Sequence, residues 1–380
     1  MNKTILLTGI TGAVGQSITP VLKQHGYRLV YLARPKGIFT GKDRAKQLLG
    51  DVLTSDDVCC EGDLAENLHL DPLPWRGKID AVLHCAGSIS FESSAADETW
   101  RVNVDGTENM LRLANELAIP HFHFISTAYV AGSAEVFTEA DVYVGQQNSN
   151  QYEESKRAAE ELVRSFRGSS TIYRMSIMVG HSTTFVTPSF NGYYGFFQSL
   201  WRLRQSLKSR WKTESEALRA ERVIFSEKDR LFIPLTIHCS PTSTLNLIPC
   251  DWFSETLSEV LKLSCGHRAT QIYHLTHPNP PRVQWVIEET LSRMGIDGIT
   301  CIATPRGGAS GGSPLSVVER FQKVLDRGLE RFHPYITHEP RFTCDALKRD
   351  LGTRYHAPRE IDSLFLANLI EFAMRMNFGK

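Results

Sequence analysis

The feature that most constrains the fold is a glycine-rich turn near the N-terminus, between an apolar strand and a helix. Thr4–Leu7 is a short apolar run, and residues 13–25 show helical spacing. Between them, Gly9 permits a tight turn, Gly12 lets the backbone approach a pyrophosphate, and Gly15 lets helix and strand pack closely. The positive end of the helix then faces the phosphates. The turn predicts dinucleotide binding, which we assign to Thr8, Gly9, Thr11, Gly12, Ala13, Val14 and Gly15.

Strand and helix signals continue to alternate through the first half of the chain. Further strands are expected at 28–33, 58–60, 79–84, 122–126 and 171–175, and helices at 97–117 and 153–166. Strands that alternate with helices of this length form a parallel, doubly wound sheet. The fold class is therefore α/β, with a Rossmann domain over residues 1–176.

The second half, residues 177–380, is less regular and is expected to form a smaller, mostly helical substrate-binding domain. A segment near 240–262 is expected to join the first domain. Residues 305–314 are rich in glycine and proline and predict a linker, and the apolar helix at 361–378 is expected to dock on the core. A membrane-surface or dimer role for that last helix is the alternative. Aromatic residues at 190–197 precede a helix that carries the basic residues Arg202, Arg204, Lys208, Arg210 and Lys212.

That basic helix has two interpretations. A solvated helix face is the one favoured, and a docking surface for an anionic partner, such as a carrier protein or a coenzyme phosphate, is the other.

Composition excludes several classes of protein. The 42 Lys and Arg balance the 42 Asp and Glu, so a dedicated nucleic-acid binder is not expected. No apolar run is long enough to span a bilayer, and no signal peptide precedes the first strand, so a cytoplasmic, stand-alone protein is expected. The eight cysteines form no C-x-x-C pair and are interpreted as reduced thiols. His274 and His277 have no acidic partner nearby in sequence, so no metal site is predicted.

The end of the second strand indicates which dinucleotide binds. Enzymes that use the unphosphorylated cofactor usually place Asp or Glu there, to accept from the ribose 2′-hydroxyl. This chain has Arg34, followed by Pro35 and Lys36. A guanidinium matches a 2′-phosphate, which predicts NADPH as the cofactor.

A second constellation lies further along the chain. Tyr152 and Lys156 are one helical turn apart on one face of the helix expected at 153–166. The strand that ends about 25 residues upstream offers a hydroxyl from Ser126 or Thr127.

With these motifs the chain resembles the extended short-chain dehydrogenase/reductase family. The resemblance implies that Thr127, Tyr152 and Lys156 are catalytic and that Ser126 is structural. Many relatives carry proline where this chain has Met175 after Arg174, so the local backbone there is expected to differ. Tyr152 and Lys156 would also contact the cofactor, together with Asp63, Leu64, Cys85, Ala86, Gly87 and Asn103.

A narrower resemblance is to the thioester-reductase and fatty-acyl-CoA-reductase branch, the "male sterility" type of NAD(P)-binding domain. It is carried by residues 84–87, 125–130, 246–252, 334–335 and 341–342. The resemblance implies an NADPH-dependent reduction of an acyl thioester, on coenzyme A or a carrier protein, to an aldehyde and possibly on to an alcohol.

In that reaction, Tyr152 would give the carbonyl oxygen a hydrogen bond and a proton, with Thr127 as a second donor. The Lys156 ammonium would lower the pKa of Tyr152 and hold the nicotinamide ribose.

Two other functions stay open. One is a different extended-family enzyme, a ketone or aldehyde reductase or a nucleotide-sugar epimerase or dehydratase. Arg34 argues against the epimerase, and the aromatic residues at 190–197 suit an acyl chain better than a sugar diphosphate. The other is a non-catalytic NAD(P)-binding sensor, which the complete Thr127, Tyr152 and Lys156 set disfavours.

Overall fold

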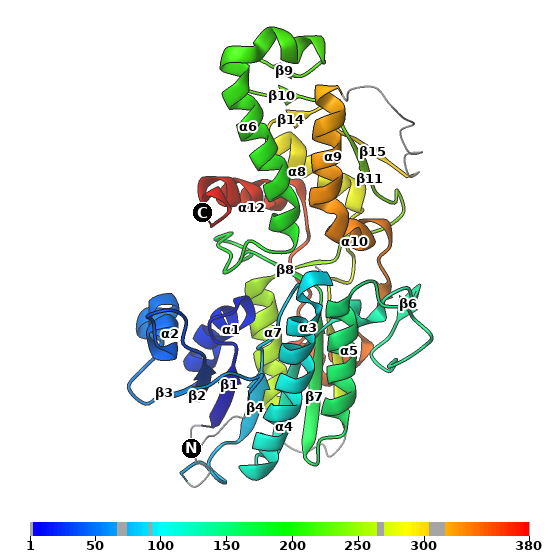
Figure 1. Ribbon diagram of the computed structural model, residues 1–380. Coiled ribbons are helices and arrows are strands. Elements are labelled where there is room, and N and C mark those ends of the chain that lie inside the picture. The colour runs from blue at the N-terminus through cyan, green and yellow to red at the C-terminus, as the bar shows by residue number, and fades with distance from the viewer. Residues whose placement is uncertain (1–2, 67–73, 91–92, 264–269, 304–315, 380) are drawn as a thin grey trace. The chain divides into compact units, whose positions relative to one another are not determined.

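The computed structural model describes residues 3–66, 74–90, 93–263, 270–303 and 316–379 (Figure 1). The linker expected at 305–314 and one cysteine, Cys265, lie outside these ranges. The chain divides into two compact units. Unit 1 consists of Met1–Met178, Ile248–Pro278 and Pro340–Pro358. Unit 2 consists of Val179–Leu247, Asn279–Glu339 and Arg359–Lys380.

Unit 1 is built on a seven-stranded sheet in the order β13-β7-β5-β4-β1-β2-β3, and each neighbouring pair is parallel. This confirms the doubly wound Rossmann fold and its six expected strands. The seventh strand, β13, comes from far along the chain. The strands are β1 (Thr4–Thr8), β2 (Arg28–Ala33), β3 (Val58–Glu61), β4 (Ala81–His84), β5 (His121–Thr127), β7 (Ser169–Met175) and β13 (Gln271–Leu275).

Helices cover both faces of this sheet, because side chains alternate along each strand. Ile5 and Leu7 of β1 pack with α1, α2, α7 and α11, whereas Leu6 packs on the opposite face with α4 and α5. The helices of unit 1 are α1 (Ala13–Gln24), α2 (Gly41–Leu49), α3 (Ala96–Trp100), α4 (Gly106–Glu116), α5 (Gln151–Arg164), α7 (Cys250–Leu263) and α11 (Asp345–Leu351). Short strands β6 (Val136–Phe137) and β16 (Arg341–Phe342) pair in parallel. Two of the five boundaries between the units fall within β8 (Ile177–Val179) and β12 (Leu247–Pro249).

The long helix expected at 97–117 is interrupted. A π-helical turn over Arg101–Asp105 separates α3 from α4. Such turns often mark functional positions, because they redirect a side chain within a helix. Here the turn buries Asn103, which is only 1% exposed.

A buried ion pair joins the helix α5 to two strands. Arg174 of β7 lies 2.7 Å from Glu160 of α5, and neither side chain is more than 2% exposed. Ser126 of β5 donates to the same carboxylate over 2.5 Å. Where many relatives have proline, β7 continues through Met175, and the Ser176 N–H donates to the Leu275 carbonyl over 3.1 Å.

Unit 2 is mostly helical, as expected for the C-terminal half. Its helices are α6 (Tyr193–Ala220), α8 (Val283–Arg293), α9 (Val317–Leu329), α10 (His333–Thr337) and α12 (Ser363–Arg375). Two small sheets accompany them, formed by β9 (Ile224–Phe225), β10 (Leu231–Phe232) and β14 (Ile296–Asp297), and by β11 (Thr236–His238) and β15 (Thr300–Ile302). None of the described helices is long and apolar enough to cross a membrane.

The aromatic residues at 190–197 form part of the core of unit 2. Tyr193, Tyr194 and Phe197 are almost fully buried. The Tyr193 hydroxyl bonds the Thr290 hydroxyl over 2.9 Å, and Phe190 stacks on Phe372 at 6.3 Å between ring centroids. Because these rings pack inside unit 2, their presence no longer favours an acyl chain over a sugar diphosphate as the substrate.

The ion pair of α5 leads to a stability prediction. Replacing Arg174 by Met leaves the Glu160 carboxylate buried without its partner, which lowers the free energy of unfolding by roughly 3–5 kcal/mol. Urea unfolding followed by circular dichroism measures this loss. The matched control is Arg157→Met, which removes the exposed pair with Glu161 on the same helix and costs less than about 1 kcal/mol. Equal losses in the two variants would contradict the prediction.

Candidate active site

The glycine turn between β1 and α1 has the geometry of a phosphate-binding loop. Gly9 has φ +71°, and a Cβ there would lie 2.6 Å from the Ala86 backbone nitrogen. A Cβ on Gly15 would collide with the Gly9 carbonyl and the Ile10 backbone. Gly12 is the N-cap of α1 and offers no side-chain oxygen to the first N–H groups of the helix. Those N–H groups and the helix dipole suit an anion, so the turn fits the pyrophosphate of a dinucleotide.

A buried histidine ties this turn to the π-helical turn. His84 Nδ1 lies 2.7 Å from the Thr8 hydroxyl, and its Nε2 lies 3.2 Å from the Thr107 hydroxyl. The Thr107 hydroxyl donates to the Asn103 carbonyl, so Nε2 must carry the hydrogen and Nδ1 must accept. Burial lowers the pKa of His84 to about 3, which keeps the ring neutral.

Asn103 and the turn after β4 are held together by side-chain hydrogen bonds. The Asn103 amide accepts from the Ser88 N–H over 2.8 Å and donates to the Ser88 carbonyl over 3.0 Å. It also donates to the Ser155 hydroxyl, which in turn donates to the Tyr152 carbonyl. A Cβ on Gly87 would lie 3.1 Å from the Asn103 side-chain oxygen, so a larger residue there would require Asn103 to shift. Residues 85–87 are thereby fixed beside Gly9 and the start of α5.

The end of β2 brings together the residues assigned to the adenosine part of the cofactor. Arg34 Nη1 lies 3.5 Å from the Asp63 carboxylate, and both side chains are partly exposed. Arg34, Lys36, Asp63 and Glu66 line one hollow at this edge. Asp63 also accepts from the Ala65 N–H, while Leu64 is buried. These positions suit an adenine and a ribose phosphate.

Sequence reasoning missed one residue at this edge, Arg44 of α2. Its guanidinium donates to the Arg34 carbonyl over 2.7 Å and to the Thr11 hydroxyl over 3.4 Å, so it spans from the end of β2 to the glycine turn. A sequence signal was present, because Thr40 and Asp43 form a capping box that starts α2. Gly41 allows the helix to begin against the Ala33 carbonyl.

The catalytic candidates Thr127 and Tyr152 lie next to each other. Thr127 ends β5, is only 4% exposed and accepts from the Tyr129 N–H. Its hydroxyl also forms a hydrogen bond with the Tyr152 phenol, which tends to lower the pKa of the phenol. Burial outweighs this effect and raises the pKa of Tyr152 to about 12. The lowering expected from Lys156 is not seen in the chain itself, and Tyr152 stays a protonated donor at neutral pH.

Lys156 is buried one turn further along α5. Its ammonium donates to the Ile125 carbonyl over 2.6 Å and lies 4.0 Å from the centre of the Phe124 ring. Burial lowers the pKa of Lys156 to about 7, while the Glu160 carboxylate opposes that shift. The remaining donor capacity of the ammonium could bind ribose hydroxyls.

Ser126 and His274 make contacts that stabilise the fold. Ser126 donates to Glu160 and takes part in the buried ion pair described above. His274 Nδ1 lies 2.8 Å from the Thr343 carbonyl, and its ring stacks on Phe137. No group of three or more His, Cys, Asp or Glu within the described ranges is arranged to hold a metal ion.

Comparison with known proteins gives a family match over most of unit 1. Residues 7–257 match the family model described as "Male sterility protein". The NRPS-like oxidoreductase fscA of Fusarium equiseti is 31% identical over 166 residues, which are 42% of this chain and 15% of that protein. The chain therefore spans a small part of that relative's length.

Solved structures match along the whole chain. The terminal R domain of the myxalamid PKS-NRPS pathway has a TM-score of 0.73 at 20% identity, over 99% of this chain and 92% of that one. A thiolation-reductase di-domain from an archaeal non-ribosomal peptide synthetase has a TM-score of 0.70 at 16% identity, over 100% of this chain and 77% of that one. At these identities the likeness shows that the fold is shared.

The buried lysine leads to a prediction about pH. The unfolded chain holds the Lys156 proton up to a pKa of about 10.4, whereas the folded chain releases it near 7. Between these values the unfolded state binds more protons, so this residue's contribution to the free energy of unfolding rises with pH.

We therefore expect the stability of the parent protein, relative to Lys156→Met, to increase between pH 6.5 and 9.5. The increase is on the order of 4 kcal/mol at most. Urea unfolding at the two pH values measures it. Lys46→Met, at an exposed lysine of α2, serves as the control and should show no such change. A pH-independent difference for Lys156→Met would contradict the assignment.

Proposed function

The chain belongs to the male sterility protein family, and from that premise we propose that it is an NADPH-dependent reductase of acyl thioesters. The proposed substrate is an acyl group carried by coenzyme A or by a carrier protein, and the proposed product is the aldehyde. A relative named as an oxidoreductase and solved structures named as reductase domains support this choice of reaction class.

The observation that carries the proposal is the hydrogen bond between the Tyr152 phenol and the Thr127 hydroxyl. Two hydroxyl donors at one point can bind a single carbonyl oxygen and stabilise the negative charge that develops on it. A phenol whose pKa is raised to about 12 keeps its proton at neutral pH, as a reduction requires of its proton donor.

The remaining residues position the reactants. The glycine turn and α1 would bind the pyrophosphate, and Lys156 would bind the nicotinamide ribose. NADPH, when bound, supplies the hydride. The Asn103 and Ser155 contacts hold the first turn of α5, so Tyr152 keeps its place next to Thr127.

In this reaction the thioester carbon gains a hydride and its oxygen gains the proton of Tyr152, which gives a hemithioacetal. Collapse of the hemithioacetal breaks the carbon–sulfur bond, and the hydroxyl proton passes to the departing thiol. The products are an aldehyde and a free thiol, so that one hydride and one proton are consumed.

The preference for NADPH rests on two arginines. Arg34 follows β2 directly, and the Arg44 guanidinium donates to the Arg34 carbonyl and to the Thr11 hydroxyl. Together they can hold a 2′-phosphate by charge-assisted hydrogen bonds, and they offset the nearby Asp63 carboxylate. A nucleotide-sugar enzyme that uses the unphosphorylated cofactor has no 2′-phosphate for these two arginines to bind. A ketone or aldehyde reductase remains the alternative, since it would use the same Tyr152 and Thr127 chemistry.

The assay for thioester reduction follows NADPH absorbance and thiol release with a medium-chain acyl-CoA and with an acyl carrier protein that bears the same acyl group. Tyr152→Phe should lower kcat at least about 100-fold, because it removes the proton donor. The control is Tyr143→Phe, at a tyrosine that is 65% exposed. Consumption of NADPH with ketones or aldehydes, while both thioesters are inert, would identify a carbonyl reductase instead.

The cofactor preference has its own prediction. Arg34→Ala and Arg44→Ala should each raise the KM for NADPH about tenfold and leave the KM for NADH nearly unchanged, because only NADPH carries the phosphate that they bind. Steady-state kinetics with the two cofactors measure this selectivity. Lys42→Ala, at an exposed lysine of the same helix, is the control. Parallel changes with both cofactors would show that the arginines act on the fold and not on the phosphate.

A further inference from the structure

Helix α9 of unit 2 presents a basic face to solvent. Its buried side includes Gln322, Leu325 and Leu329. On the opposite side, Arg320 and Arg327 are exposed and lie two turns apart, with Lys323 beside them and Arg331 following one turn later. We name Arg320, Lys323, Arg327 and Arg331 the basic ridge.

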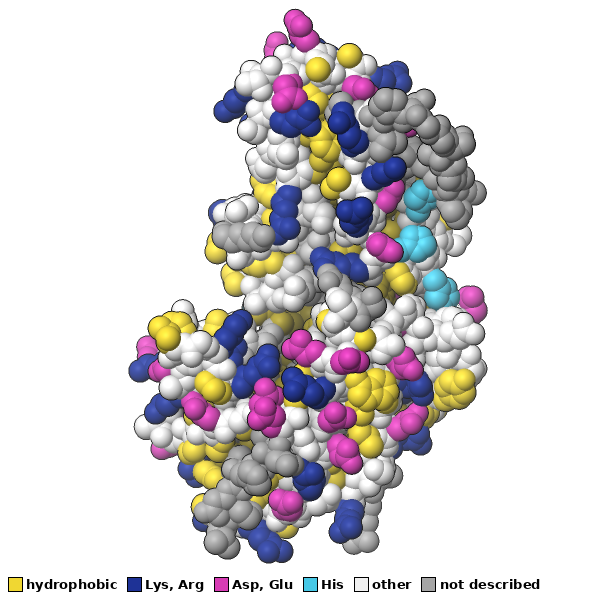
Figure 2. Space-filling model, viewed as in Figure 1, with side chains coloured by type: hydrophobic (Ala, Val, Ile, Leu, Met, Phe, Trp, Pro, Cys, Tyr) yellow, Lys and Arg dark blue, Asp and Glu magenta, His cyan; other side chains and the backbone are white. Residues whose placement is uncertain are grey.

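Helix α6 extends the positive charge along one edge of this ridge. The two helices pack closely where Gly328 of α9 meets Ser199 of α6, since a Cβ on Gly328 would lie 3.5 Å from the Ser199 hydroxyl. Arg210 of α6 lies over Phe321 of α9 at 5.7 Å, and Arg202 is exposed two turns earlier on α6. Figure 2 shows Lys and Arg side chains gathered over these two helices.

The charges of the ridge are not neutralised locally. On α6, Lys208 is paired with Asp229 and Arg210 with Glu214. Within the described ranges, no carboxylate lies at ion-pair distance from Arg320, Lys323 or Arg327. The ridge therefore keeps a net positive charge.

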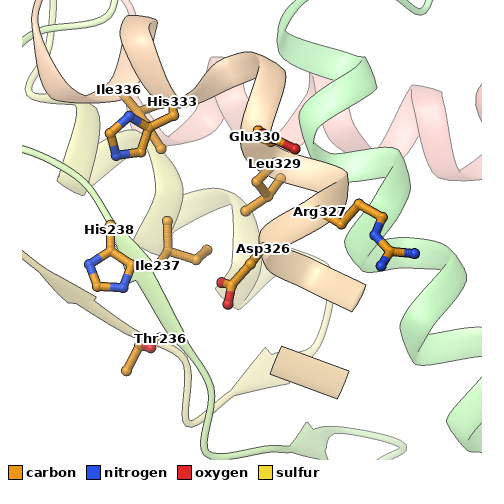
Figure 3. Close-up of a pocket in the computed structure, with 9 residues that line it drawn as sticks. All are labelled: Thr236, Ile237, His238, Asp326, Arg327, Leu329, Glu330, His333 and Ile336. Carbon is orange, nitrogen blue, oxygen red and sulfur yellow. The ribbon is translucent and has the colours of Figure 1, made fainter. Parts of the chain in front are cut away.

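The acidic residues of α9 are turned away from the ridge. Glu319 caps the helix through Ser316, and Asp326 accepts from the Gln322 amide over 2.6 Å. In Figure 3, Asp326 points toward the β11 side, whereas Arg327 points toward α6. Asp326 and Arg327 thus lie on different sides of α9, whereas Glu330, just after the helix, is exposed next to Arg331 in the chain.

An apolar side chain lies within the ridge. Val324 is 64% exposed and lies one turn from Arg320 and Arg327 on the same side of α9. An exposed apolar residue among charged ones can supply an apolar contact inside a polar rim when a partner binds.

The length of the ridge favours a partner larger than a single phosphate group. From Arg320 to Arg331 the ridge is about 16 Å long, several times the width of one phosphate group and comparable to three turns of a helix. Insertion of α9 into a membrane would require an exposed apolar face, and the apolar face of α9 is buried by Leu325 and Leu329.

We propose that the basic ridge docks an acidic protein helix, and that the partner is the carrier protein that delivers the acyl thioester. The partner's identity rests on the proposed function, and the solved thiolation-reductase di-domain gives a precedent for a carrier next to this fold. Charge complementarity along the ridge would speed association and fix the register of the carrier, and Val324 would supply the apolar contact.

The first experiment measures binding without turnover. A fluorescently labelled holo-acyl carrier protein, acidic and without an acyl group, is titrated with the parent protein and with R320E/R327E. The double reversal should raise the Kd at least about tenfold, because it places like charges across the interface. R320Q/R327Q should show a smaller loss, and thermal unfolding confirms that each variant is folded. The control R164E/R167E reverses two exposed arginines of unit 1 and should leave the Kd unchanged.

The second experiment compares two substrates with the same acyl chain. R320E/R327E should raise the KM for the carrier-bound thioester and leave the KM for acyl-CoA within about twofold. An equal rise for both substrates would mean that the ridge holds coenzyme phosphates, and would overturn the proposal. Binding of phosphatidylserine-containing vesicles that is lost in R320E/R327E would also overturn it, in favour of a lipid surface.

The two experiments separate this proposal from the proposed function. Carrier binding that depends on the ridge, without turnover of either thioester, would support the docking surface and reject the thioester reductase. Turnover of thioesters with no carrier binding, or with carrier binding that the charge reversal does not weaken, would support the thioester reductase and reject the docking surface.

Discussion

The arrangement of the candidate active site depends on the buried pair between Glu160 and Arg174. The pair joins α5 to β7, and the Ser126 hydroxyl adds β5 to the same carboxylate. Thr127 is the next residue on β5, and Tyr152 lies two turns before Glu160 on α5. Because a buried charge without its partner is strongly destabilising, strand and helix are held in one register, which brings the two hydroxyls together.

Burial sets the chemistry of the ionisable groups in unit 1. It raises the pKa of Tyr152 to about 12, lowers that of Lys156 to about 7 and keeps His84 neutral. Each shift favours the uncharged form, as expected where water is excluded. The neutral His84 can then link Thr8 to Thr107, and so connect the glycine turn to the π-helical turn that carries Asn103. The same exclusion of water keeps the Tyr152 phenol protonated and makes the Lys156 proton easier to release. It also keeps His84 in the neutral form that links the glycine turn to its surroundings.

In unit 2, the cost of burial separates the apolar side chains of the core from the charged side chains of the surface. The aromatic residues at its first helix are buried and form its core, while the basic ridge lies exposed on and just after α9. Apolar rings gain by leaving water, whereas Arg and Lys keep their charged ends hydrated unless a carboxylate is at hand. The four charged ends of the basic ridge therefore stay exposed to water.

The sequence alone determined what depends on near neighbours in the chain. The glycines of the turn, the four-residue spacing of Tyr152 and Lys156, and the alternation of strands and helices are local, and they predicted the Rossmann fold and the pairing of these side chains on one helix face. The tertiary structure decided what depends on distant segments. It placed β13 in the first unit, brought Arg44 to Arg34 and Thr11, raised the pKa of Tyr152 and split the long helix at Asn103. These outcomes follow from burial and contacts between residues far apart in the chain, which no local pattern encodes.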